Sequence, residues 1–312
     1  MSKWIIVTGA TGTVGYGLLK MASQAGYSSV VLAHRGSKRT AHLETIFNCH
    51  VLELNIDEYE NAEKILSDAD LPLEYCFFFH LAWRGTTGES RNDAEIQEKN
   101  IVASLEAVKL AHRLKCEAFI GAGSQAEYGR VDGVIRPDTP AFPETGYGIA
   151  KLCAGQLTRM LCNQLSIRHE WARILSVYGP FDGENTLIST AIRQMSAQDE
   201  TCFTEGKQIW DYLFSYDAGK ALLLIAERGI NNRVYPIGSG RTLPLAEYIQ
   251  TIADITGYEK EIGFGQIPYS ANQVMHLQAD ISSLTVDTGF QPEYSFREGI
   301  QLTIRENIGN LA

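Results

Sequence analysis

The stretch Thr8-Gly-Ala-Thr-Gly-Thr-Val-Gly15 decides the fold of this chain. It connects a short apolar run, Trp4–Thr8, to a segment with helical spacing over about 13–25. Glycines at 9, 12 and 15 permit a sharp turn and the close approach of a pyrophosphate. The following helix offers that anion free N–H groups and a positive dipole end. Since a second apolar run follows, the context predicts dinucleotide binding in preference to a purely structural turn.

The first half of the chain alternates apolar runs with segments of helical spacing. The predicted strands are 4–8, 29–34, 50–54, 75–82, 118–124 and 169–177. Predicted helices follow over about 39–47, 59–67, 93–114 and 146–165. Because the strands are apolar on both faces, the fold class is predicted to be α/β, with a doubly wound parallel (Rossmann) sheet covered by helices on both sides.

The rhythm breaks after Tyr178-Gly-Pro180. We expect a loop, a helix over about 186–197, a short strand, a helix capped by Asp217, and a strand near 234–237 that returns to the main sheet. Ser295-Phe-Arg-Glu298 is a capping-box pattern that opens a last helix. We therefore predict a dinucleotide-binding domain over 1–177 plus about 211–240. A smaller C-terminal α/β substrate domain is predicted over about 178–210 plus 241–312.

Composition limits the classes of function. The 312 residues hold 27 Lys and Arg against 37 Asp and Glu, a formal net charge of −10, so nucleic acid is not an expected partner. No apolar run is long enough to cross a bilayer and no signal-peptide pattern is present, so we expect no membrane partner and a cytoplasmic location. Six scattered cysteines indicate free thiols, and seven histidines without ligand spacing predict no metal.

The end of the second predicted strand indicates which dinucleotide binds. An Asp or Glu there would accept hydrogen bonds from the ribose 2′-hydroxyl of NAD. This chain has His34-Arg35-Gly36-Ser37-Lys38-Arg39 instead. A guanidinium suits a 2′-phosphate and this stretch contains no carboxylate to repel it, which favours NADP. If the loop is only a solvated basic segment, NAD is the cofactor.

The pattern Tyr-x-x-x-Lys occurs three times, at Tyr16/Lys20, Tyr147/Lys151 and Tyr216/Lys220. The first tyrosine lies at the start of the glycine-loop helix and the third precedes the predicted cap, so both are interpreted as structural. Tyr147 opens the helix after the strand that ends in Gly121-Ala-Gly-Ser124. Since ligands of open α/β sheets bind at the carboxyl edge, Ser124, Tyr147 and Lys151 are the predicted catalytic residues.

The chemistry of these three side chains fits a carbonyl reaction. Lys151 lies one turn after Tyr147 on the same helix face. Its ammonium and a positive nicotinamide ring would lower the pKa of the phenol, which is ordinarily near 10. Tyr147 then exchanges a proton with a substrate oxygen as hydride moves, and the Ser124 hydroxyl hydrogen-bonds the same oxygen.

These residues resemble the extended short-chain dehydrogenase/reductases of the nucleotide-sugar epimerase/dehydratase/reductase group. The resemblance covers nearly the whole chain. It is carried by residues 8–15, His80-Leu-Ala82, Asn100, Ser124 with Tyr128-Gly129, Tyr147, Lys151, residues 173–180, Gly206-Lys-Gln-Ile-Trp-Asp211, Asp217-Ala218 and Ile237-Gly-Ser239. His80 itself is expected to be a core histidine. A homodimer formed through the 93–114 helix is also implied, although packing on its own sheet explains the same pattern.

The resemblance implies two sets of binding residues. Cofactor contacts are implied for Gly9, Thr11, Gly12, Thr13, Val14, Gly15, His34, Arg35, Asn55, Ile56, Leu81, Ala82, Asn100, Tyr147, Lys151 and Leu175. Contacts to a nucleotide-sugar substrate are implied for Trp83, Arg84, Ser124, Gln125, Ser176, Asn185, Thr186, Leu187, Lys207 and Trp210.

Three reactions of this group compete. Sugar 4,6-dehydratases carry Asp-Glu directly after the catalytic hydroxyl residue, whereas Gln125 and Ala126 stand here and disfavour elimination of water. Because Arg35 suits exchangeable NADPH, an NADPH-dependent 4-keto-deoxysugar reductase is favoured, with a nucleotide-sugar 4-epimerase as the alternative. A non-catalytic NADP sensor is disfavoured because the tyrosine and lysine are both kept.

Two departures from the group weaken the assignment of a substrate. Trp210 stands where an arginine often contacts the nucleotide, and candidates to replace its charge are Arg84, Arg193, Lys207 and Arg241. Trp83-Arg84-Gly85 replaces small residues and is expected to reshape the sugar pocket.

Overall fold

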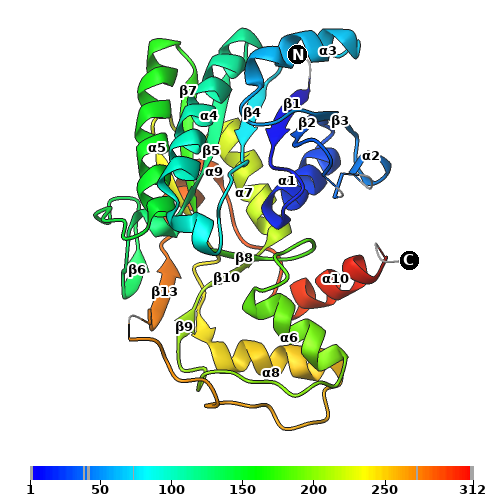
Figure 1. The fold of residues 1–312 in the computed structure, drawn as a ribbon, viewed down its shortest axis with the longest axis vertical. Helices are drawn as coiled ribbons and strands as arrows, with labels where there is room; N and C mark the ends of the chain where they lie inside the picture. Colours follow the sequence, from blue (N-terminus) through cyan, green and yellow to red (C-terminus); the bar gives the residue numbers. More distant parts are fainter. Residues whose placement is uncertain (1–2, 38, 41–42, 73, 272, 310–312) are drawn as a thin grey trace.

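The computed structural model describes residues 3–37, 39–40, 43–72, 74–271 and 273–309. Within them the main sheet has seven strands, all parallel, in the order β11-β7-β5-β4-β1-β2-β3 (Figure 1). The strands are β1 (Trp4–Thr8), β2 (Ser28–Ala33), β3 (Cys49–Glu53), β4 (Phe77–His80), β5 (Ala118–Ser124), β7 (Arg168–Ile174) and β11 (Val234–Ile237). The predicted doubly wound parallel sheet and the return of the 234–237 strand to it are confirmed.

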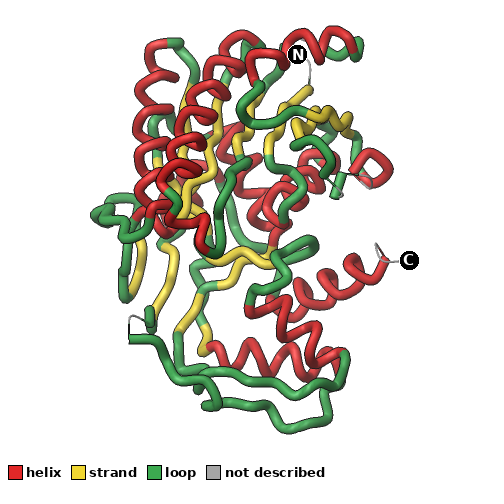
Figure 2. The backbone as a smooth tube through the Cα atoms, viewed as in Figure 1, coloured by secondary structure: helices red, strands yellow, loops and turns green. Residues whose placement is uncertain are grey.

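Helices cover both faces of this sheet, as Figure 2 shows. Alternate strand residues point to opposite faces, so Phe77 and Phe79 pack in one core cluster and Phe78 in the other. The first cluster is covered by α1 (Thr13–Gln24), α7 (Ser215–Arg228) and α9 (Ser282–Thr288). The second is covered by α3 (Ala62–Asp68), α4 (Ala94–Arg113) and α5 (Gly146–Gln164). Burial on both faces explains why the strands are apolar throughout.

A smaller layer lies beyond the carboxyl ends of the main strands, in the lower part of Figure 1. Among the described residues, a four-stranded sheet runs in the order β12-β9-β13-β6 and a two-stranded parallel one pairs β10 with β8. Their bounds are β6 (Gly133–Ile135), β8 (Ser176–Tyr178), β9 (Ile209–Trp210), β10 (Tyr212–Phe214), β12 (Leu243–Pro244) and β13 (His276–Ala279). The helices of this layer are α6 (Leu187–Ser196), α8 (Leu245–Thr256) and α10 (Phe296–Gly309). Because β6 comes from the first half of the chain, the small sheet joins distant segments, and the predicted division into two domains stays a prediction.

Several predicted elements differ in detail. The run 169–177 is divided, because β7 ends at Ile174 and the next strand pairs with β10 instead. The region 59–67 begins as a 3-10 turn, η1 (Tyr59–Asn61), before α3. The helix expected over 39–47 is only α2 (Leu43–Ile46), and residues 41–42 lie outside the described residues.

The caps of two helices test the sequence patterns directly. The prediction that Asp217 caps a helix is wrong: α7 starts at Ser215, and the Asp217 carboxylate accepts hydrogen bonds from the N–H groups of Glu293 and Tyr294. This acid therefore ties the C-terminal segment to α7. The capping box before α10 is confirmed, since Ser295 N donates to Glu298 at 2.8 Å and Glu298 N donates to the Ser295 hydroxyl at 3.3 Å.

Candidate active site

The glycine loop between β1 and α1 contains two glycines that the fold requires for steric reasons and one that it does not. Gly9 has φ +74°, and a Cβ there would lie 2.5 Å from the backbone nitrogen of Ala82. A Cβ on Gly15 would lie 2.4 Å from the Cα of Ala10. A Cβ on Gly12 would meet only the Gly9 oxygen at 3.9 Å, so this glycine leaves open space that the fold itself does not need.

The same loop is prepared for an anion. No side chain caps the N-terminus of α1, which begins directly after Gly12. The buried Thr13 hydroxyl oxygen has no hydrogen-bond partner among the described residues. An uncapped helix N-terminus, a spare hydroxyl and an open glycine together fit the pyrophosphate of a dinucleotide.

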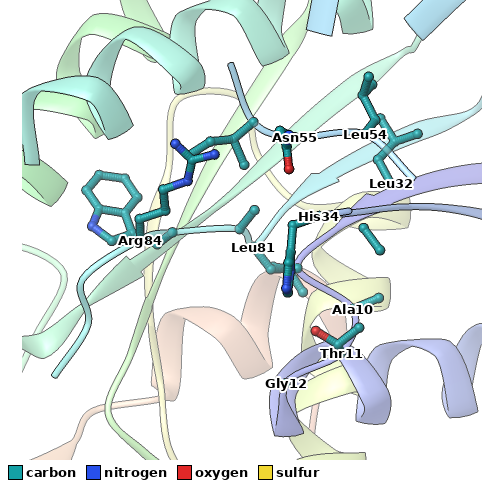
Figure 3. Close-up of a pocket in the computed structure, with 14 residues that line it drawn as sticks. Ala10, Thr11, Gly12, Leu32, His34, Leu54, Asn55, Leu81 and Arg84 are labelled. Atoms are coloured by element: carbon teal, nitrogen blue, oxygen red, sulfur yellow. The ribbon is translucent and has the colours of Figure 1, made fainter. Parts of the chain in front are cut away.

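A cavity of about 520 Å³ extends from this loop along the carboxyl ends of β2, β3 and β4 (Figure 3). Figure 3 shows His34 and Leu81 between the glycine loop and Asn55. Its lining contains ten of the residues implied to bind cofactor or substrate, namely Gly9, Thr11, Gly12, His34, Asn55, Ile56, Leu81, Ala82, Trp83 and Arg84. The structure therefore brings eight of the implied cofactor residues and two of the implied substrate residues, Trp83 and Arg84, to one cavity.

Arg35, two positions after the end of β2, already has an anionic partner. Its guanidinium donates to Glu58 at 3.2 and 3.3 Å, and this hydrogen bond is the main cause that lowers the pKa of Glu58. Glu53 accepts a hydrogen bond from Gly36 N at 3.2 Å. The local sequence contains no carboxylate, but the neighbouring strand β3 and the turn after it bring two beside the loop. Lys38 lies outside the described residues.

A second cavity, of about 420 Å³, contains the predicted catalytic residues. Ser124 ends β5, while Tyr147 and Lys151 lie on the first two turns of α5. The lining also contains the predicted residues Gly9, Gly12, Thr13, Val14, Gly15, Leu81, Trp83 and Leu175. The phenol, ammonium and hydroxyl therefore converge on one space that continues from the glycine loop.

Burial is the main influence on the ionisation of Lys151 and Tyr147. Lys151 is fully buried and donates to the carbonyl oxygen of Ala122 at 2.7 Å, and desolvation lowers its pKa to about 7. Burial raises the pKa of Tyr147, while a hydrogen bond with Ser124 and the charge of Arg91 act in the opposite direction. Proton exchange at this phenol therefore depends on the polar groups that surround its ring.

Glu127 is a site residue that we did not predict. Its buried carboxylate accepts hydrogen bonds from Ser124 N at 2.8 Å, from the Trp171 indole at 2.9 Å and from Arg173 at 2.6 Å. It lies in the short helix η3 (Gln125–Glu127), for which Ser124 is the N-cap. The spacing Ser-x-x-Glu is a capping-box signal that was available in the sequence. Glu127 thus fixes the backbone that carries the Ser124 hydroxyl.

His80 and Asn100 support the site from behind. His80 is bound by the hydroxyls of Thr8 and Ser104 at 3.0 and 3.1 Å, and burial lowers its pKa to about 3, so the predicted core histidine is confirmed. The Asn100 amide pairs with both the N–H and the C=O of Arg84 at 2.9 Å. Its contact is therefore with the chain segment that lines the cavity, and a direct cofactor contact stays a prediction.

The other two Tyr-x-x-x-Lys pairs lie elsewhere. The hydroxyls of Tyr16 and Tyr216 both donate to Glu306 of α10, at 2.9 and 2.5 Å. Neither tyrosine lines the two cavities described above. Their structural interpretation is confirmed.

The implied substrate residues are only partly brought together. Gln125 and Trp210 line a third cavity of about 180 Å³, which Arg91 and Arg130 also line. The Trp210 indole donates to the Ser176 hydroxyl at 2.8 Å. Asn185, Thr186 and Leu187 lie at the start of α6, and the exposed Lys207 pairs with Glu205; none of these four lines the three cavities. Their contacts with a substrate stay predictions.

None of the four candidates to replace a charge at Trp210, namely Arg84, Arg193, Lys207 and Arg241, lines the third cavity. Arg84 faces the first cavity and pairs with Asp57, and Arg193 donates to the Glu184 carbonyl oxygen. Neither lines the third cavity, where Arg91 and Arg130 lie instead. In the described part of the chain, no cluster of three or more acidic, histidine or cysteine side chains is arranged to hold a metal. No helix there is long and apolar enough to cross a membrane.

This fold and site define a dinucleotide-dependent enzyme of the short-chain dehydrogenase/reductase type. The chain matches the NAD dependent epimerase/dehydratase family over residues 5–238 and belongs to it. The resemblance inferred from the motifs is therefore confirmed, as is its consequence that the protein is an enzyme.

The chain is similar to several named proteins. It is 26% identical to "CDP-abequose synthase" of Salmonella muenchen over 307 residues, which cover 96% of this chain and 97% of that protein. It is 26% identical to "dTDP-4-dehydro-6-deoxyglucose reductase" of Escherichia coli over 215 residues, 66% of each chain. Among solved structures, UDP-glucose 4-epimerase with UDP-glucose from Thermotoga maritima is 25% identical with a TM-score of 0.83, covering 99% of this chain and all of that one.

Proposed function

We propose that this protein is an NADPH-dependent reductase that acts on the 4-keto group of a nucleotide-activated deoxysugar. The observation that carries the proposal is the convergence of Ser124, Tyr147 and Lys151 at a cavity that continues into the glycine loop. Gln125 and Ala126 follow the catalytic hydroxyl, so a 4,6-dehydratase lacks its acid and base at this place. Two of the similar proteins carry names of deoxysugar enzymes, which supports the substrate class.

In this reaction each catalytic side chain has one task. NADPH, when bound, supplies the hydride that reduces the carbonyl carbon. Tyr147 donates its phenol proton to the carbonyl oxygen, and the Ser124 hydroxyl donates a hydrogen bond to the same oxygen. Lys151 in its ammonium form stabilises the phenolate that remains. Solvent then returns a proton to Tyr147, so the balance is one ketone, one hydride and one proton for each alcohol formed.

The choice of NADP over NAD is part of the proposal. Arg35 is the group that supports it, since it follows the end of β2 and is next in sequence to His34, which lines the larger cavity. Glu58 holds this guanidinium, so a 2′-phosphate must take the place of the carboxylate. NAD is the alternative if the ion pair persists when the cofactor is bound.

The test is turnover of a panel of 4-keto-6-deoxysugars carried on CDP, dTDP and UDP. Loss of NADPH absorbance with one panel member, abolished in Tyr147→Phe, is the expected result. NADPH binding without turnover on any member, and without an effect of Tyr147→Phe, would instead indicate a cofactor sensor. Elimination of water from an unmodified nucleotide sugar would indicate a dehydratase.

A 4-epimerase is the second candidate. It is favoured by the similarity of the whole chain to the UDP-glucose 4-epimerase structure. An epimerase returns its hydride, so it interconverts an unreduced nucleotide sugar without net consumption of cofactor. Product analysis of UDP-glucose and UDP-galactose incubated with NAD distinguishes this activity from the reductase.

We also propose that the protein acts as a cytoplasmic homodimer. Val102 on α4 and Ile149 and Met160 on α5 are exposed apolar side chains on two helices that pack side by side. A two-fold contact through these helices would cover them. Light scattering should give twice the chain mass for the native protein and a monomer for Val102→Glu with Ile149→Lys; a native monomer would refute the dimer.

A further inference from the structure

The segment 83–91 after β4 is held in place by two amide side chains of α4. Gln97 accepts the Trp83 indole N–H at 2.9 Å and donates to the carbonyl oxygens of Gly85 and Ser90 at 2.8 and 3.0 Å. Asn100 pairs with the backbone of Arg84. Gln97 and Asn100 are 3% and 1% exposed, so the segment is anchored from inside the protein.

The far end of this segment is docked onto the start of α5. Asn92 ends the 3-10 helix η2 (Glu89–Asn92), and its side chain accepts a hydrogen bond from Gly146 N at 3.0 Å. A Cβ on Gly146 would lie 3.3 Å from the Arg91 carbonyl oxygen, so the two elements touch closely. As a result, Arg91 lies beside the catalytic tyrosine, although 56 positions separate them in the sequence.

The Arg91 side chain covers the face of the Tyr147 ring. Its guanidinium carbon lies 4.3 Å from the ring centroid, well within cation–π range, and Nη1 donates to the Thr86 carbonyl oxygen at 2.6 Å. Within the described residues no carboxylate forms an ion pair with it. Its positive charge therefore acts on the phenol ring and on the 180 Å³ cavity that Arg91 lines.

We propose that Arg91 is a positioning residue of this active site, whose guanidinium stabilises the phenolate of Tyr147 and so sets the pH range of proton transfer. The inference rests on the proposed reductase function for its kinetic test only. A stacked cation favours the negative form of the ring oxygen more than the neutral form. Lys151 is less effective in this role near neutral pH, because burial brings its own pKa to about 7.

Besides Arg91, the charged groups near the phenol come from α5, from η3 and the loop after it, and from Arg39 and Asp182, which line the 420 Å³ cavity with Tyr147. Lys151 of α5 lies 5.8 Å from the ring centroid, and Glu127 of η3 raises the pKa of the phenol by its negative charge. Arg130 faces the same small cavity but is paired with Glu144 at 2.7 Å. Arg91 is thus the cation whose removal changes the balance at Tyr147 most directly, and Arg130 provides a matched control.

The kinetic test compares the pH dependence of kcat/KM in Arg91→Met, Arg91→Lys and Arg130→Met with the native enzyme. A reductase loses activity at high pH as the phenol loses its proton. We expect this limb to move up by about half to one pH unit in Arg91→Met. Arg91→Lys should restore part of the shift and Arg130→Met should leave the limb in place. Coincident limbs in the native enzyme and Arg91→Met would overturn the proposal.

A second measurement does not need turnover and so separates this inference from the proposed function. Protein labelled with ¹³Cζ-tyrosine is titrated with NADP⁺ present, and the Tyr147 resonance is assigned by its loss in Tyr147→Phe. The midpoint of the Tyr147 titration should rise in Arg91→Met relative to the native protein. A resonance that stays protonated throughout, or an unchanged midpoint, would overturn the role of Arg91. If no 4-keto sugar is turned over, only the proposed function fails.

Discussion

The buried ion pair between Glu127 and Arg173, next to Ser124, permits a quantitative prediction. The side chains of Glu127 and Arg173 are 0% and 6% exposed, and their atoms lie 2.6 Å apart. Glu127→Gln keeps the shape but leaves a buried guanidinium without its counter-charge, which typically costs about 3–5 kcal/mol of unfolding free energy. The Tyr128 ring, 4.4 Å from the guanidinium carbon, still attracts it, so we expect a loss near the lower end, about 3 kcal/mol.

A double-mutant cycle isolates the pair. Arg173→Met leaves the Glu127 carboxylate with two N–H donors, from Ser124 and Trp171, so its loss should be smaller. In the double variant neither charge is left buried alone. Its loss of unfolding free energy should therefore be about 2 kcal/mol smaller than the sum of the losses in the two single variants. Lys109→Met, which removes an exposed pair with Glu106, should cost less than about 1 kcal/mol and serves as the control.

Unfolding in urea followed by circular dichroism gives these free energies, provided that the slopes agree between variants. Additive losses, within about 0.5 kcal/mol, would refute the claim that the two charges depend on each other. Since Ser124 N also binds Glu127, Glu127→Gln should lower kcat as well. An unchanged kcat would show that the carboxylate supports the fold and not the position of the hydroxyl.

Three further predictions concern the glycine loop, the core histidine and the pair of Arg35 with Glu58. Gly12→Ala should change the unfolding free energy by less than about 0.5 kcal/mol but abolish dinucleotide binding, because its Cβ enters open space. Gly15→Ala should lower the unfolding free energy by about 2 kcal/mol, because its Cβ clashes with the backbone. A larger loss of unfolding free energy in Gly12→Ala than in Gly15→Ala would contradict the roles given to these glycines. Burial lowers the pKa of His80 to about 3. Because the unfolded chain binds this proton below about pH 6.5 and the native protein does not, His80 lowers the unfolding free energy by about 1.4 kcal/mol per pH unit between about pH 6.5 and pH 3. His80→Gln should make the loss in urea stability between about pH 6 and pH 4 less steep, and an equal slope would contradict this. Arg35→Ala should weaken NADPH roughly tenfold more than NADH, whereas Glu58→Gln should favour NADPH by freeing the guanidinium; equal effects on both cofactors in binding titrations would exclude a 2′-phosphate contact.

The parts of the site that the sequence predicted well are those encoded locally. Residues 8–15 specify a strand end, a turn and a helix start within one short stretch, and the structure gives Gly9 and Gly15 a steric reason. The pair Tyr147 and Lys151 is separated by one helical turn, so their common face follows from helix geometry alone. Ser124 could be placed because a parallel strand ends at the carboxyl edge of the sheet.

The parts that were missed depend on contacts between distant segments. Glu58 reaches Arg35 from the turn after the next strand, 23 positions away, and this changes the charge that a 2′-phosphate would meet. Arg91 reaches Tyr147 only because α4 and α5 pack together and hold η2 between them. The wrong cap at Asp217 has the same origin, since the backbone N–H groups that it binds lie 76 and 77 positions later. A pattern along the chain cannot specify which of several distant partners a charged side chain will find.

Around the third cavity, positive charge comes from residues other than the one at position 210. Trp210 of β9 gives the third cavity an apolar wall together with Ile135 and Leu277, and its indole N–H is already bound to Ser176. The positive groups bordering that cavity are Arg91 and Arg130, which lie on the catalytic side and not on β9. An anionic substrate held there would therefore be drawn towards the Tyr147 ring. Substrate binding and the ionisation of the phenol are then coupled through one guanidinium, so changes at Arg91 should alter KM and the pH profile together, while changes at Trp210 should alter KM alone.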